Sequence, residues 1–198
     1  MPTRELRADL IAAATALVER AGSAEAVSLR AVAREAGVTA PAVYGHFADL
    51  DALLAAVLDE GFAALRTAVT EAVARRSDPG ERLVAGCRAY VETGLAAPGR
   101  YRAMFGPRRV AGSRQAFGLL VEGVAACAAA GRSRSRDPEA EATLLWTALH
   151  GLVTLRAAAP EGPWPDLDEQ LPALVGRLAL LTPAGDAGRD QAGPPGPV

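Results

Sequence analysis

The sequence contains no lysine, so arginine supplies all 21 of its basic side chains. Arginine's planar guanidinium suits phosphate groups and guanine edges, although the base composition of a genome also produces such a bias. The 21 basic residues face 23 acidic ones, and the net charge is −2. A strongly basic chain would point directly to nucleic acid, so charge alone does not predict that partner here.

Cysteine is also scarce. Cys87 and Cys127 do not suggest a disulfide framework, and they favour a reduced cytoplasmic protein. No apolar run reaches the length of a membrane span, and the charged N-terminus, MPTRELRADL, lacks the hydrophobic region of a signal peptide. We therefore expect a soluble cytoplasmic protein with no membrane partner.

Aromatic residues make up only 5% of the chain, and runs of β-branched residues are absent. Alanine and leucine dominate instead, which favours an all-α protein. Half of the 198 residues are hydrophobic, enough for a sizeable core in one large domain or two small ones. The pattern along the chain predicts about nine helices.

The stretch from Ser28 to Phe47, SLRAVAREAGVTAPAVYGHF, has the pattern of two short helices joined by a tight turn. Apolar or small residues recur on one face of the first helix, at positions Leu29, Val32, Ala33 and Ala36. Gly37 suits a turn at positive φ, Thr39 stands where an N-cap belongs, and Pro41 is tolerated in a first helical turn. These features predict a helix-turn-helix, with an ordinary buried helical hairpin as the alternative. Tyr44 and His46 speak against the hairpin, because they make the second helix too polar to be buried on all sides.

Residues Arg4–Phe62 resemble the N-terminal DNA-binding domain of the TetR family of transcriptional regulators. The resemblance is carried by LRAVAREAGVTAPAVYGHF and by the D-x-x-x-L-L pattern of Asp49, Leu53 and Leu54. It implies a homodimer that binds a palindromic operator and senses a small molecule with its C-terminal domain, with repression as the usual mode.

The predicted DNA contacts lie at the starts of both helices and along the second one. They are Ser28, Arg30, Thr39, Ala40, Pro41, Ala42, Tyr44 and His46. Tyr44 and His46 suit phosphates, as the family resemblance also implies, and Arg30 suits a phosphate or a guanine edge. For Ser28 and Thr39, helix capping alone is an equal alternative.

One position departs from the family pattern. Where the family often has a lysine as a phosphate anchor, this chain has Leu50, flanked by Asp49 and Asp51. We therefore expect weak non-specific affinity for DNA with a shallow dependence on salt.

The rest of the chain divides at proline- and glycine-rich breaks. The predicted helices span residues 4–21, 49–76, 79–96, 98–105, 115–130, 138–158 and 167–181, in addition to the helix-turn-helix. We expect a DNA-binding domain over residues 1–48 and a ligand-binding and dimerisation domain over 49–182, entered by the linking helix 49–76. Residues 183–198 read as a disordered tail. The arginines at positions 108, 109, 132, 134 and 136 read as solvated loop charges.

A second resemblance concerns the C-terminal half. Trp146, His150 and Gly151 resemble the tryptophan–histidine–glycine signature of one TetR C-terminal subfamily. Apolar and aromatic residues on three predicted helices are candidates for an effector pocket, with His150 as its polar group: Tyr101, Met104, Phe105, Phe117, Leu120, Val121, Trp146 and His150. For each residue alone, a plain core position is the alternative.

The sequence thus predicts a ligand-responsive transcription factor, with a helical small-molecule-binding protein without a DNA role as the alternative. The dispersed histidines and cysteines have no metal-ligand spacing, and we expect neither a metal nor a cofactor. No catalytic constellation occurs, so we expect no enzyme. Apolar residues of the last two helices predict a homodimer interface there: Leu144, Leu145, Leu149, Leu152, Val153, Leu171, Leu174, Val175, Leu178 and Leu181.

Overall fold

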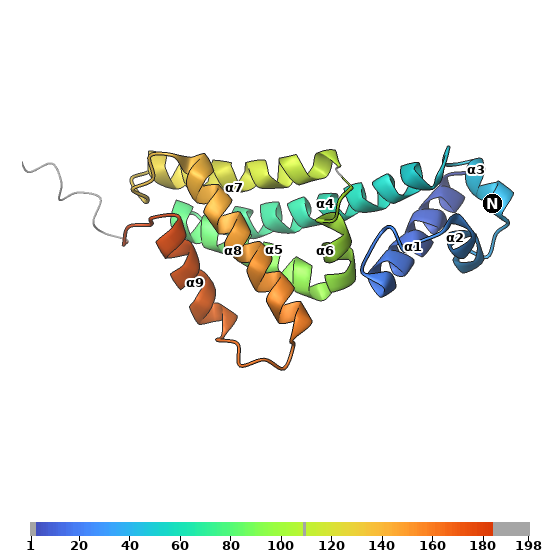
Figure 1. Cartoon of the computed structure of the whole chain (residues 1–198). Helices are drawn as coiled ribbons and strands as arrows, with labels where there is room; N and C mark the ends of the chain where they lie inside the picture. Colours follow the sequence, from blue (N-terminus) through green and yellow to red (C-terminus); the bar gives the residue numbers. More distant parts are fainter. Residues whose placement is uncertain (1–2, 109, 184–198) are drawn as a thin grey trace, which may run out of the picture.

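The computed structural model describes residues 3–108 and 110–183, and this part of the chain is all-α, as predicted. Its nine helices are α1 (Thr3–Ala21), α2 (Leu29–Glu35), α3 (Ala40–Tyr44), α4 (Leu50–Ala74), α5 (Pro79–Ala96), α6 (Pro98–Met104), α7 (Ala111–Ala129), α8 (Pro138–Ala158) and α9 (Leu167–Leu178). Figure 1 shows an elongated molecule, with α1–α3 at one end and α5 and α7–α9 at the other. No helix of the described part is long and apolar enough to cross a membrane.

Four helices begin where a short polar side chain accepts a hydrogen bond from the backbone three residues later. The acceptors are Ser28, Asp49, Asp78 and Asp137, at 2.7–3.3 Å from the backbone nitrogen. Each satisfies a backbone N–H that the helix itself leaves without a partner. Proline follows at the first position of α5 and of α8, where its missing N–H costs nothing. These local signals explain why the starts of these helices were predictable.

The first core joins α1, α2, α3 and the first half of α4. Leu10, Val32, Val43 and Leu53 are fully buried in it, one from each of these helices. Gly22 and Gly37, with φ of 65° and 68°, make the turns after α1 and α2. The helix-turn-helix therefore packs with α1 and α4 in one helical unit.

The second core is built by α5, α7, α8 and α9, with Tyr101 of α6. Its fully buried members include Val91, Val124, Leu145 and Leu171. At 25 residues, α4 is roughly 37 Å long, so it reaches from the first core to the second. Figure 1 shows α4 running between the two ends of the molecule.

Two predicted helix ends are wrong. Helix α7 begins at Ala111, not at residue 115, because Gly112 packs against α4, where an added Cβ would lie 2.6 Å from Cβ of Phe62. Helix α9 ends at Leu178, not at 181, because the chain turns at Leu180 (φ 52°). Leu181 then forms an isolated antiparallel β-bridge with Ser133. Both ends are set by packing between segments distant in sequence. The predicted disordered tail lies, from residue 184, outside the described residues.

Helix α6 joins the two cores. Gly99 lies so close to α1 that an added Cβ would lie 1.9 Å from the backbone oxygen of Glu19. The backbone N–H groups of Gly99 and Arg100 donate to the two carboxylate oxygens of Glu19, at 3.0 and 2.7 Å. Ala97, the N-cap of α6, has no side chain that could accept these bonds. Helix α1 therefore supplies the cap that α6 lacks.

Two of the loop arginines predicted to be solvated form ion pairs. Arg108 lies 2.9 Å from Asp51 and 3.3 Å from Glu25. Arg132 holds Asp78 through two contacts, at 2.7 and 3.2 Å. The prediction was wrong for both because their partners are far away in the sequence. Arg109 lies outside the described residues.

Candidate DNA interface and effector cavity

The second helix of the helix-turn-helix presents small residues and one phenol to solvent. Val43 is fully buried and fixes α3 on the first core, whereas Tyr44 is 60% exposed and Thr39 and Pro41 are exposed. His46 is partly buried. The side chain of Thr39 makes no capping hydrogen bond, so it is available to a partner.

The remaining predicted contacts border this face. Ser28 is exposed and caps α2 by accepting from Ala31, which confirms its capping role, while its contact with DNA stays a prediction. Arg30 is exposed, and the structure describes no ion pair for it. Ala40 and Ala42 are partly buried along α3. The eight predicted residues thus lie on or beside the two helices of the motif.

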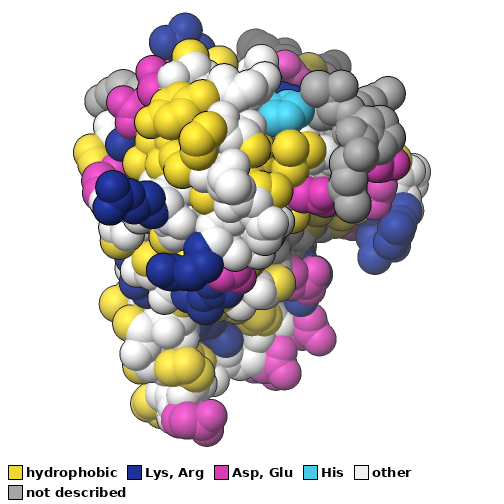
Figure 2. All heavy atoms as spheres, turned by 90° about the vertical axis from the view of Figure 1, so that its right-hand side faces the viewer, with side chains coloured by type: hydrophobic (Ala, Val, Ile, Leu, Met, Phe, Trp, Pro, Cys, Tyr) yellow, Lys and Arg dark blue, Asp and Glu magenta, His cyan; other side chains and the backbone are white. Residues whose placement is uncertain are grey.

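Charges of both signs surround the motif. Asp51, at the acidic start of α4, is paired with Arg108, and the Arg7 guanidinium lies 5.0 Å from the centroid of the Phe47 ring. Figure 2 looks onto this end of the molecule and shows basic and acidic side chains interspersed, with no continuous basic surface among the visible described residues. The expected weak non-specific affinity for DNA stays a prediction, which this mixture of charges supports.

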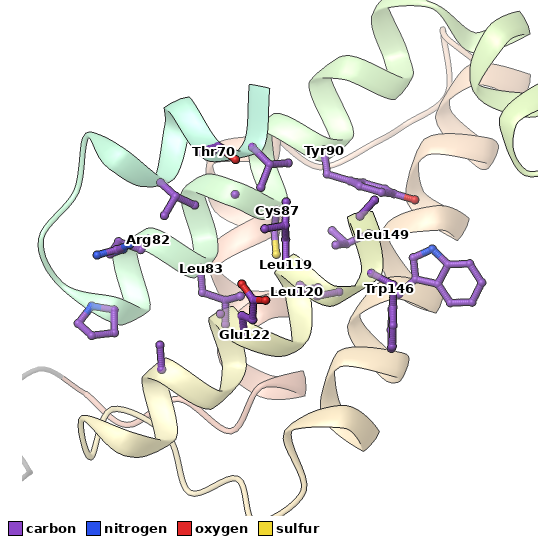
Figure 3. Close-up of a pocket in the computed structure, with 18 of the residues that line it drawn as sticks. Thr70, Arg82, Leu83, Cys87, Tyr90, Leu119, Leu120, Glu122, Trp146 and Leu149 are labelled. Atoms are coloured by element: carbon purple, nitrogen blue, oxygen red, sulfur yellow. The ribbon is translucent and has the colours of Figure 1, made fainter. Parts of the chain in front are cut away.

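A cavity of about 390 Å³ lies between α4, α5, α7 and α8. Most of its wall is apolar. The lining residues are Val69, Thr70, Val73, Pro79, Arg82, Leu83, Gly86, Cys87, Tyr90, Phe105, Ser113, Ala116, Phe117, Leu119, Leu120, Glu122, Gly123, Ala126, Trp146 and Leu149. Figure 3 shows Arg82 toward one end of the cavity and Tyr90 and Trp146 toward the other.

Four of the eight residues predicted to bind an effector line this cavity: Phe105, Phe117, Leu120 and Trp146. The other four do not. Met104 belongs to the first core, where it packs against Gly61, and Val121 lies beside the second core. Tyr101 and His150 lie behind the wall, because α6 and α8 direct them toward each other.

Three polar side chains form a chain of hydrogen bonds that ends at the wall. The hydroxyls of Tyr90 and Tyr101 are 2.7 Å apart, and the hydroxyl of Tyr101 lies 2.9 Å from Nδ1 of His150. Burial raises the pKa of both tyrosines, that of Tyr90 to about 12, and lowers the pKa of His150 below its usual value. All three groups are therefore neutral near pH 7, and only Tyr90 reaches the cavity.

The contributions of α4 and α5 to the cavity wall were not predicted from the sequence. Leu83, Cys87 and Tyr90 recur along α5 at spacings of four and three, so they share one face, and Val69 and Val73 do the same on α4. This periodicity was visible in the sequence, but it does not say whether an apolar face meets a core or a cavity.

The two cysteines are poor redox sensors. Both are buried free thiols, and burial raises the pKa of Cys87 to about 12 and that of Cys127 to about 11. The reactive form is the thiolate, which is nearly absent near pH 7 at such values. Within the described residues, no three His, Cys, Asp or Glu side chains form a group that could hold a metal ion.

Comparison with solved structures shows the fold. A protein of unknown function from Rhodococcus sp. RHA1 is 32% identical, with 88% of this chain and 93% of that chain covered and a TM-score of 0.75. A bacterial regulatory protein of the tetR family from Rhodococcus RHA1 is 22% identical, with coverages of 88% and 95% and a TM-score of 0.70. AibR, in complex with isovaleryl coenzyme A and operator DNA, is 20% identical, with coverages of 89% and 100% and a TM-score of 0.69. No curated protein matches the chain.

Two family models match the sequence. The model described as "Bacterial regulatory proteins, tetR family" matches residues 10–57, which include the whole helix-turn-helix. The model described as "Tetracyclin repressor-like, C-terminal domain" matches residues 83–178, which include most of the cavity wall. The chain therefore belongs to the TetR family of DNA-binding transcriptional regulators.

Proposed function

We propose that this regulator is a homodimeric repressor that a small, mostly apolar effector releases from a palindromic operator. The observation that carries the proposal is that α4 contributes both to the core under the helix-turn-helix and to the wall of the cavity. Leu53 and Leu58 are buried in the core beneath the helix-turn-helix, and Val69 and Val73 line the cavity. A ligand that displaces the second half of α4 therefore displaces the first half, provided that it binds the two conformations with different affinity.

Helix α6 supplies a second mechanical connection. Phe105, just after α6, lines the cavity, while Gly99 and Arg100 at its start are bonded to Glu19 of α1. A change in the cavity near Phe105 thus reaches α1 through a helix of only seven residues.

The proposed roles of the two domains follow from these contacts. Residues 1–48 bind DNA, through the eight residues predicted on the helix-turn-helix. Residues 49–182 bind the effector and the second subunit, and within them the effector contacts Phe105, Phe117, Leu120 and Trp146. The finer assignment to the tryptophan–histidine–glycine subfamily rests on Trp146, His150 and Gly151 alone. We assign the chain no catalytic role.

The proposed dimer uses an exposed face of α8. Leu144 and Leu155 are 56% and 57% exposed, and a Cβ added at Gly151 between them would touch nothing within 4 Å. Of the ten apolar residues predicted for the interface, which include Leu144 but not Leu155, six are buried in the subunit's own core and cannot contact a partner: Leu145, Leu149, Leu152, Val153, Leu171 and Val175. An isologous contact through the exposed face of α8 is the arrangement that leaves this core intact.

A selection of random duplexes bound by the purified protein tests the proposal. We expect an enriched palindrome whose half-sites are about one helical turn of DNA apart, or a multiple of it, as the symmetry of a dimer requires. The enriched duplex, placed upstream of a reporter gene, should lower expression when the protein is present. Enrichment of a non-palindromic site would contradict the dimer, and raised expression would make the protein an activator.

A further inference from the structure

We infer that Tyr90 selects the effector, and that the effector is an uncharged, elongated, mostly apolar molecule with one hydroxyl or carbonyl oxygen at the Tyr90 end. This inference rests on the proposed function, because it concerns the ligand of the proposed effector cavity. Tyr90 takes the place of His150, which was predicted as the polar group of the pocket but lies behind the wall.

The charge of the wall argues for an uncharged ligand. Of the described residues that line the cavity, only Arg82 and Glu122 belong to the arginine, lysine, aspartate and glutamate types. Both are exposed and they carry opposite signs, so the cavity offers no net charge. An ion that entered the buried part, beside Cys87 and Leu149, would lose its hydration without a counter-charge, which is strongly unfavourable.

The shape of the wall argues for an elongated ligand. The lining residues of α5 run from Pro79 to Tyr90, which corresponds to roughly 16 Å along the helix axis. Aromatic side chains gather at the Tyr90 end, where the rings of Phe105 and Phe117 lie 6.3 and 6.2 Å from that of Trp146. At the other end, Figure 3 shows Arg82 beyond Leu83. A ligand with its bulky part among the aromatic rings and a narrow tail along α5 fits this outline.

The series of hydrogen bonds from Tyr90 through Tyr101 to His150 explains why Tyr90 binds one ligand oxygen. It also explains why this oxygen can belong to a hydroxyl or to a carbonyl group. A tyrosine hydroxyl has one hydrogen and can also accept, and neutral histidine donates through one ring nitrogen and accepts through the other. When Nδ1 of His150 accepts from Tyr101, Tyr101 accepts from Tyr90. The Tyr90 oxygen, which the indole N–H of Trp146 also approaches, can then accept from a ligand but not donate to it. When Nδ1 donates, all the bonds reverse, and Tyr90 can donate. Tyr90 therefore matches a hydroxyl in one state and a carbonyl in the other.

Three probes that differ only at the polar end test this assignment by calorimetry: 4-propylphenol, propylbenzene and 4-propylbenzoate. The wild type should bind 4-propylphenol most tightly and 4-propylbenzoate least. Tyr90→Phe should weaken binding of 4-propylphenol roughly 3- to 10-fold, the range expected for one neutral hydrogen bond, and change binding of propylbenzene by less than about twofold. The matched control is Thr67→Val, which removes an exposed hydroxyl that does not line the cavity and should leave all three affinities unchanged.

Tyr101→Phe provides a second test, which does not depend on the folding of the Tyr90 variant. It cuts the chain behind Tyr90, so it should lower the preference for 4-propylphenol over propylbenzene while Tyr90 itself remains. Tighter binding of 4-propylbenzoate would overturn the inference and place an anion near Arg82. Equal affinities for 4-propylphenol and propylbenzene would also overturn the inference, as would equal losses of affinity for both in Tyr90→Phe. Either result would mean that the hydrogen bonds of Tyr90, Tyr101 and His150 are purely structural.

Failure of all three probes to bind at millimolar concentration would overturn the inference but not the proposed function. Operator binding by the same protein, measured on the selected duplex, separates the two. A protein that binds a palindrome and ignores these probes is a regulator with a different effector, whereas one that binds the probes and no palindrome lacks the proposed function.

Discussion

Tyr44 is a large aromatic side chain that the described part of the molecule leaves 60% exposed. It stands at the end of α3, one residue beyond the buried Val43 that fixes this helix. A phenol held outward by a rigid neighbour is suited to donate to a phosphate, a contact that positions a protein without reading sequence.

We therefore expect Tyr44→Ala to weaken binding to the selected operator and to a scrambled duplex by a similar factor, roughly 2- to 10-fold. Arg30→Ala should weaken binding to the operator more than binding to the scrambled duplex, if its guanidinium reads a guanine. Fluorescence anisotropy on the two duplexes measures both effects, with Trp164→Phe as a distant control. An unchanged operator affinity in Tyr44→Ala would remove this residue from the interface.

His150 makes a second prediction at this scale, on the pH dependence of stability. Burial lowers its pKa in the folded protein, so below the usual value near 6.5 the unfolded chain binds the proton more readily. The contribution of neutral His150 to the free energy of unfolding is therefore fully present above pH 6.5, the ordinary pKa of histidine. It is lost as the pH falls from there through the lower pKa of the folded protein. His150→Gln cannot titrate and keeps an acceptor for Tyr101.

The difference in free energy of unfolding between the wild type and His150→Gln should thus change between about pH 7 and pH 5, to the disadvantage of the wild type. Urea denaturation at several pH values measures it. A difference that stays constant over this range would mean that His150 titrates alike in the folded and unfolded states.

At the scale of the element, α6 depends on a neighbour for its start. Glu19 of α1 accepts from two of its backbone N–H groups, and no side chain of α6 takes that role. Glu19→Ala leaves both donors without their acceptor in a partly buried position, so it should destabilise the protein by about 1–3 kcal/mol. Glu19→Gln keeps one acceptor oxygen and should cost less.

Chemical denaturation measures these losses, and Glu5→Ala is the matched control, because Glu5 is an exposed glutamate of the same helix. The same variant bears on the proposed function. If α6 carries the effect of a ligand to α1, Glu19→Ala should weaken the influence of a bound effector on operator affinity. A full ligand response in a stable Glu19→Ala protein would leave α4 as the remaining connection.

At the scale of the whole molecule, the exposed face of α8 is the proposed dimer interface. Leu144 and Leu155 lie on it with more than half of their surface exposed. Leu155→Asp should therefore dissociate the proposed dimer and abolish tight operator binding without unfolding the subunit, as light scattering and circular dichroism would reveal. Thr67→Asp, an exposed site on α4, is the control for the added charge. A Leu155→Asp protein that stays dimeric would place the interface elsewhere. Charges at Leu174 or Leu178 test the interface less cleanly, because both side chains also pack on the second core.

The sequence by itself determined the helix-turn-helix and most helix starts. The turn at Gly37, the cap at Ser28 and the aspartate–proline starts of α5 and α8 each depend on a few adjacent residues, so a local pattern suffices. The composition likewise set the all-α class.

Only the tertiary structure decided which apolar residues face the cavity, the core or solvent. Leu144 and Leu145 are neighbours in the sequence, yet one is 56% exposed and the other fully buried. Periodicity shows that a helix has an apolar face, but the packing of distant helices determines what covers it. The same holds for Tyr90, which became the candidate ligand-selecting residue only because α5, α6 and α8 bring it to Tyr101 and His150.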